Sequence, residues 1–314
     1  MYHKKLYRKQ NNGGIWNVGI LQKLVGESQV WADEPMKDHT TFRVGGCARY
    51  LVEPVDIKQL ADVIAACQKA KIPYYIVGNG SNLLVSDAGY DGVIIHLFKN
   101  MSAIEVQEEQ MKLQAGALLV KAASIACREG LTGLEFASGI PGTIGGALVM
   151  NAGAYGGEMK NVVSYVKVLM PDGSLREYTN EEMAFGYRKS RIAKEHSIVL
   201  EAVLTLHRGD GEEIRARMME LKEQRVRKQP LEYASAGSTF KRPEGYFAGK
   251  LIEDAGLRGF RIGDAQVSEK HCGFVVNRGE ASAAQIAEVI QYVQRKVYEK
   301  TGVQLQTEVK FLGW

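Results

Sequence analysis

The chain has 314 residues, of which 45% are hydrophobic and 24% charged, so it is long enough for two or three globular domains. Its 40 basic and 36 acidic residues are interspersed, and the net charge of +4 is too small to indicate a nucleic-acid or membrane partner. A small-molecule partner is therefore expected. Four scattered cysteines favour a reduced, cytoplasmic protein over a disulfide framework. Residues 1–18 contain no apolar core of signal-peptide length, so we interpret them as a loose leader.

Helix and strand signals alternate from about residue 40 onward, which predicts an α+β or α/β protein. The expected elements are a helix capped by Asp56 that ends before Pro73, strands at 74–77, 83–85 and 93–97, a helix at 118–128, a hairpin of strands 162–170 and 174–179, a strand at 198–206 and a charged helix at 212–228. A domain boundary is expected near residue 209. Ser282 and Gln285 form a capping box for a helix that ends at Gly302, and residues 303–311 alternate as a strand does.

Many of the glycines lie in two segments suited to a phosphate-bearing ligand. The first, Gly78-Asn79-Gly80-Ser81-Asn82, follows a predicted strand, where glycines let backbone amides approach a pyrophosphate. Leu83 stands where the Rossmann fingerprint has its third glycine, so an ordinary glycine turn is the alternative. The second runs from Ser138 to Gly157, and its small residues would waste conformational entropy unless something lies against the backbone. A dinucleotide beside a helix starting near Thr143 would explain this cost, and a tightly packed turn is the alternative.

Three further segments carry groups suited to catalysis. The guanidinium of Arg188, within the basic run 187–191, suits a carboxylate or diphosphate, although such a run is usually a solvated loop. Residues 235–243 place the Ser238 hydroxyl beside cations, but alone they are typical of a turn. Glu308 lies on the polar face of the last predicted strand, where most carboxylates face solvent. P-loop and zinc-ligand spacings are both missing, so no metal is expected.

Taken in order, six segments resemble the UDP-N-acetylenolpyruvoylglucosamine reductase (MurB) family from residue 39 to residue 314. These segments are His39–Gly46, Gly78–Leu84, Gly139–Gly157, Gly186–Arg191, Ala236–Lys241 and Thr307–Val309. The resemblance implies an α+β chain with the FAD-binding fold of the vanillyl-alcohol oxidase type and a C-terminal α/β substrate-binding domain. It implies an FAD-binding domain at 19–208 in two lobes split near residue 73. A substrate-binding domain at 209–302 and a final strand, 303–314, that returns to the FAD domain would complete the chain.

The resemblance also assigns roles to individual residues. Arg188, Ser238 and Glu308 fall on the family's three catalytic positions. The substrate would contact Tyr155, Tyr187, Lys228 and Lys241. The cofactor would contact Gly78, Asn79, Gly80, Ser81, Asn82, Leu83, Ser138, Gly139, Pro141, Gly142, Thr143, Gly145, Gly146, Asn151, Ala152 and Gly153. The short interval between Arg188 and Ser238 resembles the type II form of the family, which lacks an inserted tyrosine-bearing loop.

The family's reaction implies that NADPH reduces FAD and that a hydride then passes from flavin N5 to UDP-N-acetylglucosamine enolpyruvate. The product would be UDP-N-acetylmuramate, a precursor for peptidoglycan. Arg188 would stabilise negative charge beside the substrate carboxylate, and Ser238 would supply the proton. Glu308 would assist only as a hydrogen-bond donor, so a pKa raised by burial is expected. The alternatives are a flavin oxidase or dehydrogenase acting on an alcohol or sugar, and a non-catalytic nucleotide-binding module. We expect a cytoplasmic monomer.

Overall fold

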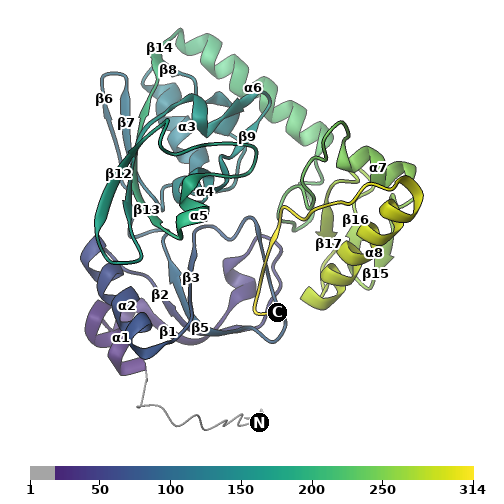
Figure 1. Ribbon diagram of the computed structural model, residues 1–314. Helices are drawn as coiled ribbons and strands as arrows, with labels where there is room; N and C mark the ends of the chain where they lie inside the picture. The colour runs from purple at the N-terminus through teal and green to yellow at the C-terminus, as the bar shows by residue number, and fades with distance from the viewer. Residues whose placement is uncertain (1–17) are drawn as a thin grey trace.

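The computed structural model describes residues 18–314 (Figure 1). Nearly all of the expected leader, residues 1–17, therefore lies outside the described residues. Helix α1 (Val18–Val25) and strand β1 (Val30–Pro35) show that regular structure starts well before residue 40. The sequence signals for α1 are weak because the helix has only 8 residues and no acidic residue in its first turn.

The first lobe is a mixed four-stranded sheet in the order β1-β2-β5-β3. Strand β1 pairs antiparallel with β2, whereas β5 runs parallel to both β2 and β3. The Asp56 side chain caps helix α2 as predicted, accepting the Gln59 N–H at 2.7 Å, and α2 provides the crossover between β2 and β3. The bounds are β2 (Cys47–Val52), α2 (Ile57–Ala70), β3 (Tyr74–Val77) and β5 (Tyr90–His96).

The division between the lobes is the first correction to the sequence prediction. A split near residue 73 would separate β3 and β5 from β2, yet all three strands belong to one sheet. The second sheet begins only at Ile104, so the division falls between His96 and Ile104. The sequence places a helix before Pro73 but does not show which strands pair across it.

The second lobe is an antiparallel five-stranded sheet in the order β12-β11-β13-β7-β6. Its strands are β6 (Ile104–Gln107), β7 (Gln110–Gln114), β11 (Val163–Leu169), β12 (Leu175–Thr179) and β13 (Ile198–Thr205). Helices α3 (Leu119–Arg128), α4 (Ile144–Met150) and α5 (Arg191–Glu195) complete the lobe. The largest hydrophobic core cluster contains side chains from both lobes, which therefore pack as one body. The predicted hairpin and the helix beginning beside Thr143 are both confirmed.

Helix α6 (Gly211–Lys228) leads from the second lobe to the C-terminal domain (Figure 1). That domain packs helices α7 (Ala248–Asp254) and α8 (Ala283–Thr301) around the sheet β15 (Arg261–Ile262), β16 (Ala265–Val267) and β17 (Val275–Asn277). The Ser282–Gln285 capping box forms as predicted, and Gly302 ends α8 with a φ of 71°. A second core cluster fills this domain.

The C-terminal segment returns to the first lobe, but most of it is not a strand. Only β18 (Lys310–Leu312) forms a ladder, parallel to β4 (Leu83–Val85). Residues 303–309 lead from the C-terminal domain to the first lobe. They have no continuous neighbouring strand, so they stay extended but form no β-ladder. The predicted alternation also reverses at the end, because Phe311 is 37% exposed and Leu312 is buried.

Short elements complete the chain. They are η1 (Glu27–Gln29), η2 (Met36–His39), β8 (Leu131–Thr132), η3 (Glu135–Ala137), β9 (Gly153–Ala154), β10 (Gly157–Glu158), η4 (Met159–Asn161) and β14 (His207–Arg208). Across residues 18–314, every helix is too short or too polar to cross a bilayer.

Candidate active site

The two glycine-rich segments, which are far apart in the sequence, lie against each other. The Asn79 Nδ2 donates to the Pro141 carbonyl at 2.6 Å. A Cβ added to Gly78 would lie 2.2 Å from the Thr143 Oγ1, and one added to Gly142 would lie 3.7 Å from the Ser81 Oγ. The first segment follows β3 and the second leads into α4, so the two loops form one surface at the junction of the lobes.

The first loop offers unused backbone donors. Among the hydrogen bonds of residues 18–314, the amides of Asn79, Gly80, Ser81 and Asn82 donate to no acceptor. The loop shape is fixed because the Thr41 N–H donates to the Gly80 carbonyl and Gly80 adopts a φ of 58°. Consecutive free amides form an anion-binding concavity, and the Thr143 side chain caps α4 beside it. These residues therefore fit the diphosphate of a dinucleotide cofactor.

Replacing Gly80 by alanine is expected to lower the FAD content of the purified protein. A Cβ there would lie 2.0 Å from the His39 carbonyl oxygen, in a φ region that non-glycine residues rarely adopt. The loop would shift, and the unfolding free energy would fall by roughly 1–3 kcal/mol. Flavin absorbance per chain and thermal unfolding measure both effects. Gly173→Ala is the control, because Gly173 has a φ of 84° but nothing within 4 Å of the added Cβ. Full flavin content in Gly80→Ala would contradict this account of the loop.

Backbone contacts place Ser238 next to the segment that carries Glu308. The Glu308 N–H donates to the Thr239 carbonyl at 2.8 Å, and Phe240 forms an antiparallel bridge with Thr307. Thr239 is itself buried and fixed, because its Oγ1 accepts the Val275 N–H at 2.9 Å. The first glycine-rich loop contacts the same segment, because the Nδ2 of Asn82 at its end donates to the Glu308 carbonyl at 3.2 Å.

Arg188, from the second lobe, meets the Glu308 side chain. Its Nε lies 2.6 Å from the Glu308 Oε1, and the two side chains are only 20% and 13% exposed. The two groups are thus in direct contact, although the Nε–H does not meet strict hydrogen-bond geometry. Arg188 stands at the tip of a two-residue hairpin closed by Gly186 and Lys189, with a φ of 54°. An arginine in this left-handed region is a sparsely populated conformation of the kind that clusters at functional sites.

Burial raises the pKa of the Glu308 carboxyl above its ordinary value. The positive charges of Arg188, Lys241 and Lys310 oppose this effect without cancelling it. The direction agrees with the expectation from the sequence. At pH values between the ordinary and the raised pKa, the folded protein therefore holds a proton at Glu308 that the unfolded chain has lost.

This proton predicts a pH-dependent effect of Glu308→Gln on stability. A folded pKa above the unfolded one makes the unfolding free energy of the wild type fall as pH rises from about 4.3 through the raised value. Glutamine does not titrate, so the unfolding free energy of the variant should not fall in this way. The unfolding free energy of the variant minus that of the wild type should therefore increase with pH across that window. Urea unfolding at several pH values measures the difference. Glu105→Gln, at an exposed strand position, is the control. A difference that does not change with pH would contradict the raised pKa.

Tyr187 and Lys241 also belong to this region. The Tyr187 hydroxyl accepts the Arg242 N–H at 3.0 Å and the Tyr187 side chain is half exposed, so it borders the site from the second lobe. The Lys241 charge acts on Glu308. Lys228, by contrast, ends α6 on the exposed surface and makes no side-chain hydrogen bond or ion pair within residues 18–314.

Three of the residues expected to bind the cofactor also have hydrogen-bond partners within the protein. The Asn151 side chain is 1% exposed, and its amide oxygen and nitrogen both have hydrogen-bond partners. Ala152 donates its N–H to Ala147 and accepts from Met159, while Gly153 pairs across the β9–β10 turn. That these three residues contact the cofactor stays a prediction, while the Asn151 side chain has a clear structural use. Its amide is used to hold the chain after α4.

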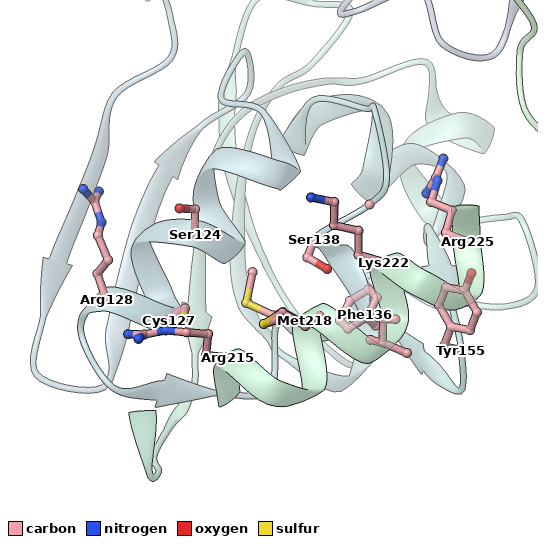
Figure 2. A pocket seen from close by; sticks show the side chains of 13 residues that line it. Ser124, Cys127, Arg128, Phe136, Ser138, Tyr155, Arg215, Met218, Lys222 and Arg225 are labelled. Atoms are coloured by element: carbon pink, nitrogen blue, oxygen red, sulfur yellow. The ribbon is translucent and has the colours of Figure 1, made fainter. Parts of the chain in front are cut away.

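A cavity of about 370 Å³ lies between α3, α6 and the start of the second glycine segment (Figure 2). Ser138, Gly139 and Tyr155 line it, as do the cations Arg128, Arg215, Lys222 and Arg225, and no carboxylate does. Figure 2 shows Arg225 near Tyr155 at one end of the cavity, with Arg128 and Arg215 toward the other end. Most of the exposed lining is apolar, from side chains such as Phe136 and Met218, and the cationic groups would suit a ligand with both an apolar and an anionic part.

Arg225 is a candidate residue that the sequence analysis missed. Burial lowers its pKa, and it has no ion-pair partner within residues 18–314. Its guanidinium packs on Gly139, where an added Cβ would lie 2.9 Å from the Nη1. The spacing of residues along α6 could have indicated Arg225. Three or four positions separate consecutive members of the set Arg215, Met218, Lys222 and Arg225, which places them on one face of the helix.

No group of histidine, cysteine, aspartate or glutamate side chains in the described part of the chain is arranged to hold a metal ion. The four cysteines are free thiols, and burial raises the pKa of Cys67 to about 12. Cys67 and Cys272 are buried among apolar side chains in the two core clusters, which indicates a packing role.

Comparisons with known proteins agree with this geometry. A family model described as FAD binding domain matches residues 48–179, and one described as UDP-N-acetylenolpyruvoylglucosamine reductase, C-terminal domain, matches residues 229–312. The UDP-N-acetylenolpyruvoylglucosamine reductase of Clostridioides difficile (strain 630) is 52% identical over 96% of this chain and 99% of that protein. The protein of the same name from Agathobacter rectalis is 52% identical over 90% of this chain and 93% of its own length.

A solved structure gives the same result. The crystal structure of UDP-N-acetylenolpyruvylglucosamine reductase (MurB) from Thermus caldophilus has a TM-score of 0.78 and 37% identity, covering 90% of this chain and 98% of that one. Together these matches confirm the predicted fold class, an FAD-binding fold of mixed helix and strand followed by a separate C-terminal domain. The chain belongs to the UDP-N-acetylenolpyruvoylglucosamine reductase family of FAD-dependent oxidoreductases.

Proposed function

We propose that the protein uses NADPH and FAD to reduce UDP-N-acetylglucosamine enolpyruvate to UDP-N-acetylmuramate, for peptidoglycan synthesis in the cytoplasm. The observation that carries this proposal is the meeting of Arg188 and Glu308 beside the Ser238 segment and the amide-rich loop. An arginine–glutamate contact, a hydroxyl-bearing segment and a diphosphate cradle thus come from four distant parts of the chain. Bound FAD would supply the hydride that NADPH delivers.

Arg188 is the group suited to the negative charge of the reaction. Addition of a hydride to the methylene carbon of the enolpyruvyl group leaves an enolate-like charge next to the substrate carboxylate. A guanidinium already held in place stabilises such charge without reorganising, which is where preorganised donors contribute most. The left-handed hairpin tip and the low exposure of Arg188 supply this preorganisation.

Glu308 would act as a hydrogen-bond donor toward the same charge. An ionised carboxylate would repel an enolate, but the pKa raised by burial favours the protonated form. The neutral carboxyl can donate one O–H while its other oxygen remains near the Arg188 guanidinium. The rate of the step should therefore fall as pH rises through the raised pKa of Glu308.

Ser238 would protonate the remaining carbon of the former double bond. A hydroxyl is a weak acid toward most groups, but an enolate is basic enough to take its proton when the two are in contact. Thr239, the next residue, is fixed by backbone bonds to residues 273 and 308, so the chain that carries the hydroxyl is anchored directly after Ser238. Half-burial of Ser238 leaves it accessible to a ligand.

The anionic parts of the substrate also have matching surfaces. The cation-lined cavity beside Tyr155 suits a phosphate of the UDP group. Lys241 and the Tyr187 hydroxyl border the separate site at Arg188 and Glu308 from the two domains. This arrangement supports a nucleotide sugar over a simple alcohol, which would not require so many cations.

Product analysis tests the proposed function. Purified protein is incubated under argon with NADPH and UDP-N-acetylglucosamine enolpyruvate, and the products are followed by mass spectrometry and by absorbance at 340 nm. We expect one NADPH to be consumed for each molecule of substrate that gains two hydrogens. NADPH consumption that requires oxygen and leaves the enolpyruvyl sugar unchanged would favour the oxidase alternative instead.

A further inference from the structure

Helix α4 connects the cofactor loops to the hairpin that carries Arg188. Its N-terminal cap, Thr143, lies against Gly78, and its C-terminal cap is Asn151. The helix has only 7 residues and packs against both β13 and α5. A short buried helix of this kind is a rigid spacer, so a group fixed to its C-terminal end keeps a fixed place relative to the cofactor loops.

Asn151 joins the end of this helix to the Arg188 hairpin. Its Nδ2 donates to the Gly186 carbonyl at 3.2 Å, two residues before Arg188. Its Oδ1 accepts the Lys160 N–H at 3.0 Å, which prevents the amide from turning. The backbone adopts a φ of 43°, a left-handed conformation that asparagine tolerates better than most residues.

A second bond secures the other side of the hairpin. The Ser190 Oγ donates to the Val149 carbonyl at 2.9 Å, from a side chain that is 7% exposed. The hairpin is thus attached to α4 both before and after its tip, while Gly186 and Lys189 close it by two backbone bonds. Only the tip residues, Tyr187 and Arg188, extend toward the C-terminal domain, where they meet residues 242 and 308.

We propose that Asn151 is a positioning residue for Arg188, acting through the Gly186 carbonyl rather than by contact with cofactor or substrate. The expected effect of Asn151 on the reaction rate rests on the proposed function, whereas its expected effect on the position of Arg188 does not. Without the Asn151 amide, Ser190 is the one remaining side-chain attachment of the hairpin to α4, and the guanidinium loses its fixed distance from Glu308. A misplacement of about 1 Å is enough to cost roughly 10²-fold in rate.

The main test compares Asn151→Gly with Asn180→Gly. Glycine keeps the left-handed backbone of residue 151 and removes both side-chain bonds. Asn180 is the matched control, because its Nδ2 also holds the Lys160 region, at 2.8 Å from the Lys160 carbonyl, but it has no bond to the hairpin. We expect Asn151→Gly to slow flavin reoxidation by the enolpyruvyl sugar about 10- to 100-fold while NADPH reduction of the flavin is retained. Asn180→Gly should reoxidise at the wild-type rate.

A double-variant comparison separates positioning from general damage. If Asn151 acts only through Arg188, then Asn151→Gly should cause no further loss in an Arg188→Ala background. A full additional loss there, or wild-type reoxidation in the single variant, would overturn the proposal. Should Asn151→Gly fail to fold, Asn151→Asp replaces it, because aspartate keeps the acceptor for Lys160 and removes only the donor to Gly186.

A second readout does not depend on turnover. The carboxyl ¹³C signal of Glu308, identified by its absence in Glu308→Gln, reports the pKa of this group in the holoenzyme. Burial raises the pKa of Glu308, and the charges of Arg188, Lys241 and Lys310 lower it. If Arg188 moves away in Asn151→Gly, its lowering effect is lost and the pKa of Glu308 should rise. In Asn180→Gly this pKa should stay constant. An unchanged pKa in Asn151→Gly would contradict the proposal. If the wild type does not reduce the enolpyruvyl sugar, the proposed function fails, but this titration still decides the role of Asn151.

Discussion

Ser238→Ala should leave reduction of the flavin by NADPH nearly intact and slow its reoxidation by the enolpyruvyl sugar about 10²- to 10⁴-fold. The hydroxyl is needed only when a carbon of the substrate takes a proton, and that event belongs to the second half of the reaction. Rapid-reaction measurements of the two halves, made separately and without oxygen, give both rate constants.

Ser235→Ala is the matched control for this variant. It removes a hydroxyl from the same segment, three residues earlier and outside the backbone contacts between residues 239–241 and 306–308. Both half-reactions should keep their wild-type rates in the control. Equal slowing of both halves in Ser238→Ala would show that this hydroxyl supports the fold or the cofactor and does not donate the proton.

Arg188→Lys should slow reoxidation by the enolpyruvyl sugar about 10²- to 10³-fold, the range found when one preorganised donor to a developing oxyanion is lost. Lysine keeps the charge but not the planar fork of donors, and its flexible stem would not reproduce the contact at 2.6 Å with Glu308. The rate constant at saturating substrate is the quantity to measure, because it separates the chemical step from binding.

The same basic run provides the control for this variant. Arg191 pairs through its Nε with Glu195 at 2.7 Å and lies over the Tyr178 ring, within the second lobe and away from Glu308. Arg191→Lys should therefore leave reoxidation unchanged. Near-normal reoxidation in Arg188→Lys would mean that Arg188 serves the structure of the interface and does not stabilise the reacting charge.

Local signals predicted most of the regular structure, because they depend on neighbouring residues. Asp56 caps α2, Ser282 and Gln285 form the predicted box, and the 171–173 turn joins β11 to β12. Features that depend on distant partners were missed. Strand pairing between β3 and β5 decides the lobe division, and residues 303–309 form no continuous strand because their pairing is limited to a short contact with residues 239–241. Periodicity alone carries no information on either.

The candidate site could likewise be predicted from the sequence only in part. Residue types and the family resemblance indicated Arg188, Ser238 and Glu308, and the structure brings Arg188 to Glu308 and the backbone beside Ser238 to the same segment. The sequence could not separate residues that face a ligand from those that hold the loops. Nothing in the sequence sets Asn151 apart from its neighbours, and only its burial and its bond to Gly186 in the structure distinguish it.

The central claim is that Arg188, Ser238 and Glu308 serve one reduction of an enolpyruvyl nucleotide sugar. Anaerobic stopped-flow absorbance near 450 nm tests it most directly, with NADPH added first and UDP-N-acetylglucosamine enolpyruvate second. We predict that the flavin band bleaches with NADPH and recovers rapidly with the enolpyruvyl sugar, and that Ser238→Ala bleaches normally but recovers slowly. A wild-type band that recovers only when air is admitted would contradict the claim and identify an oxidase.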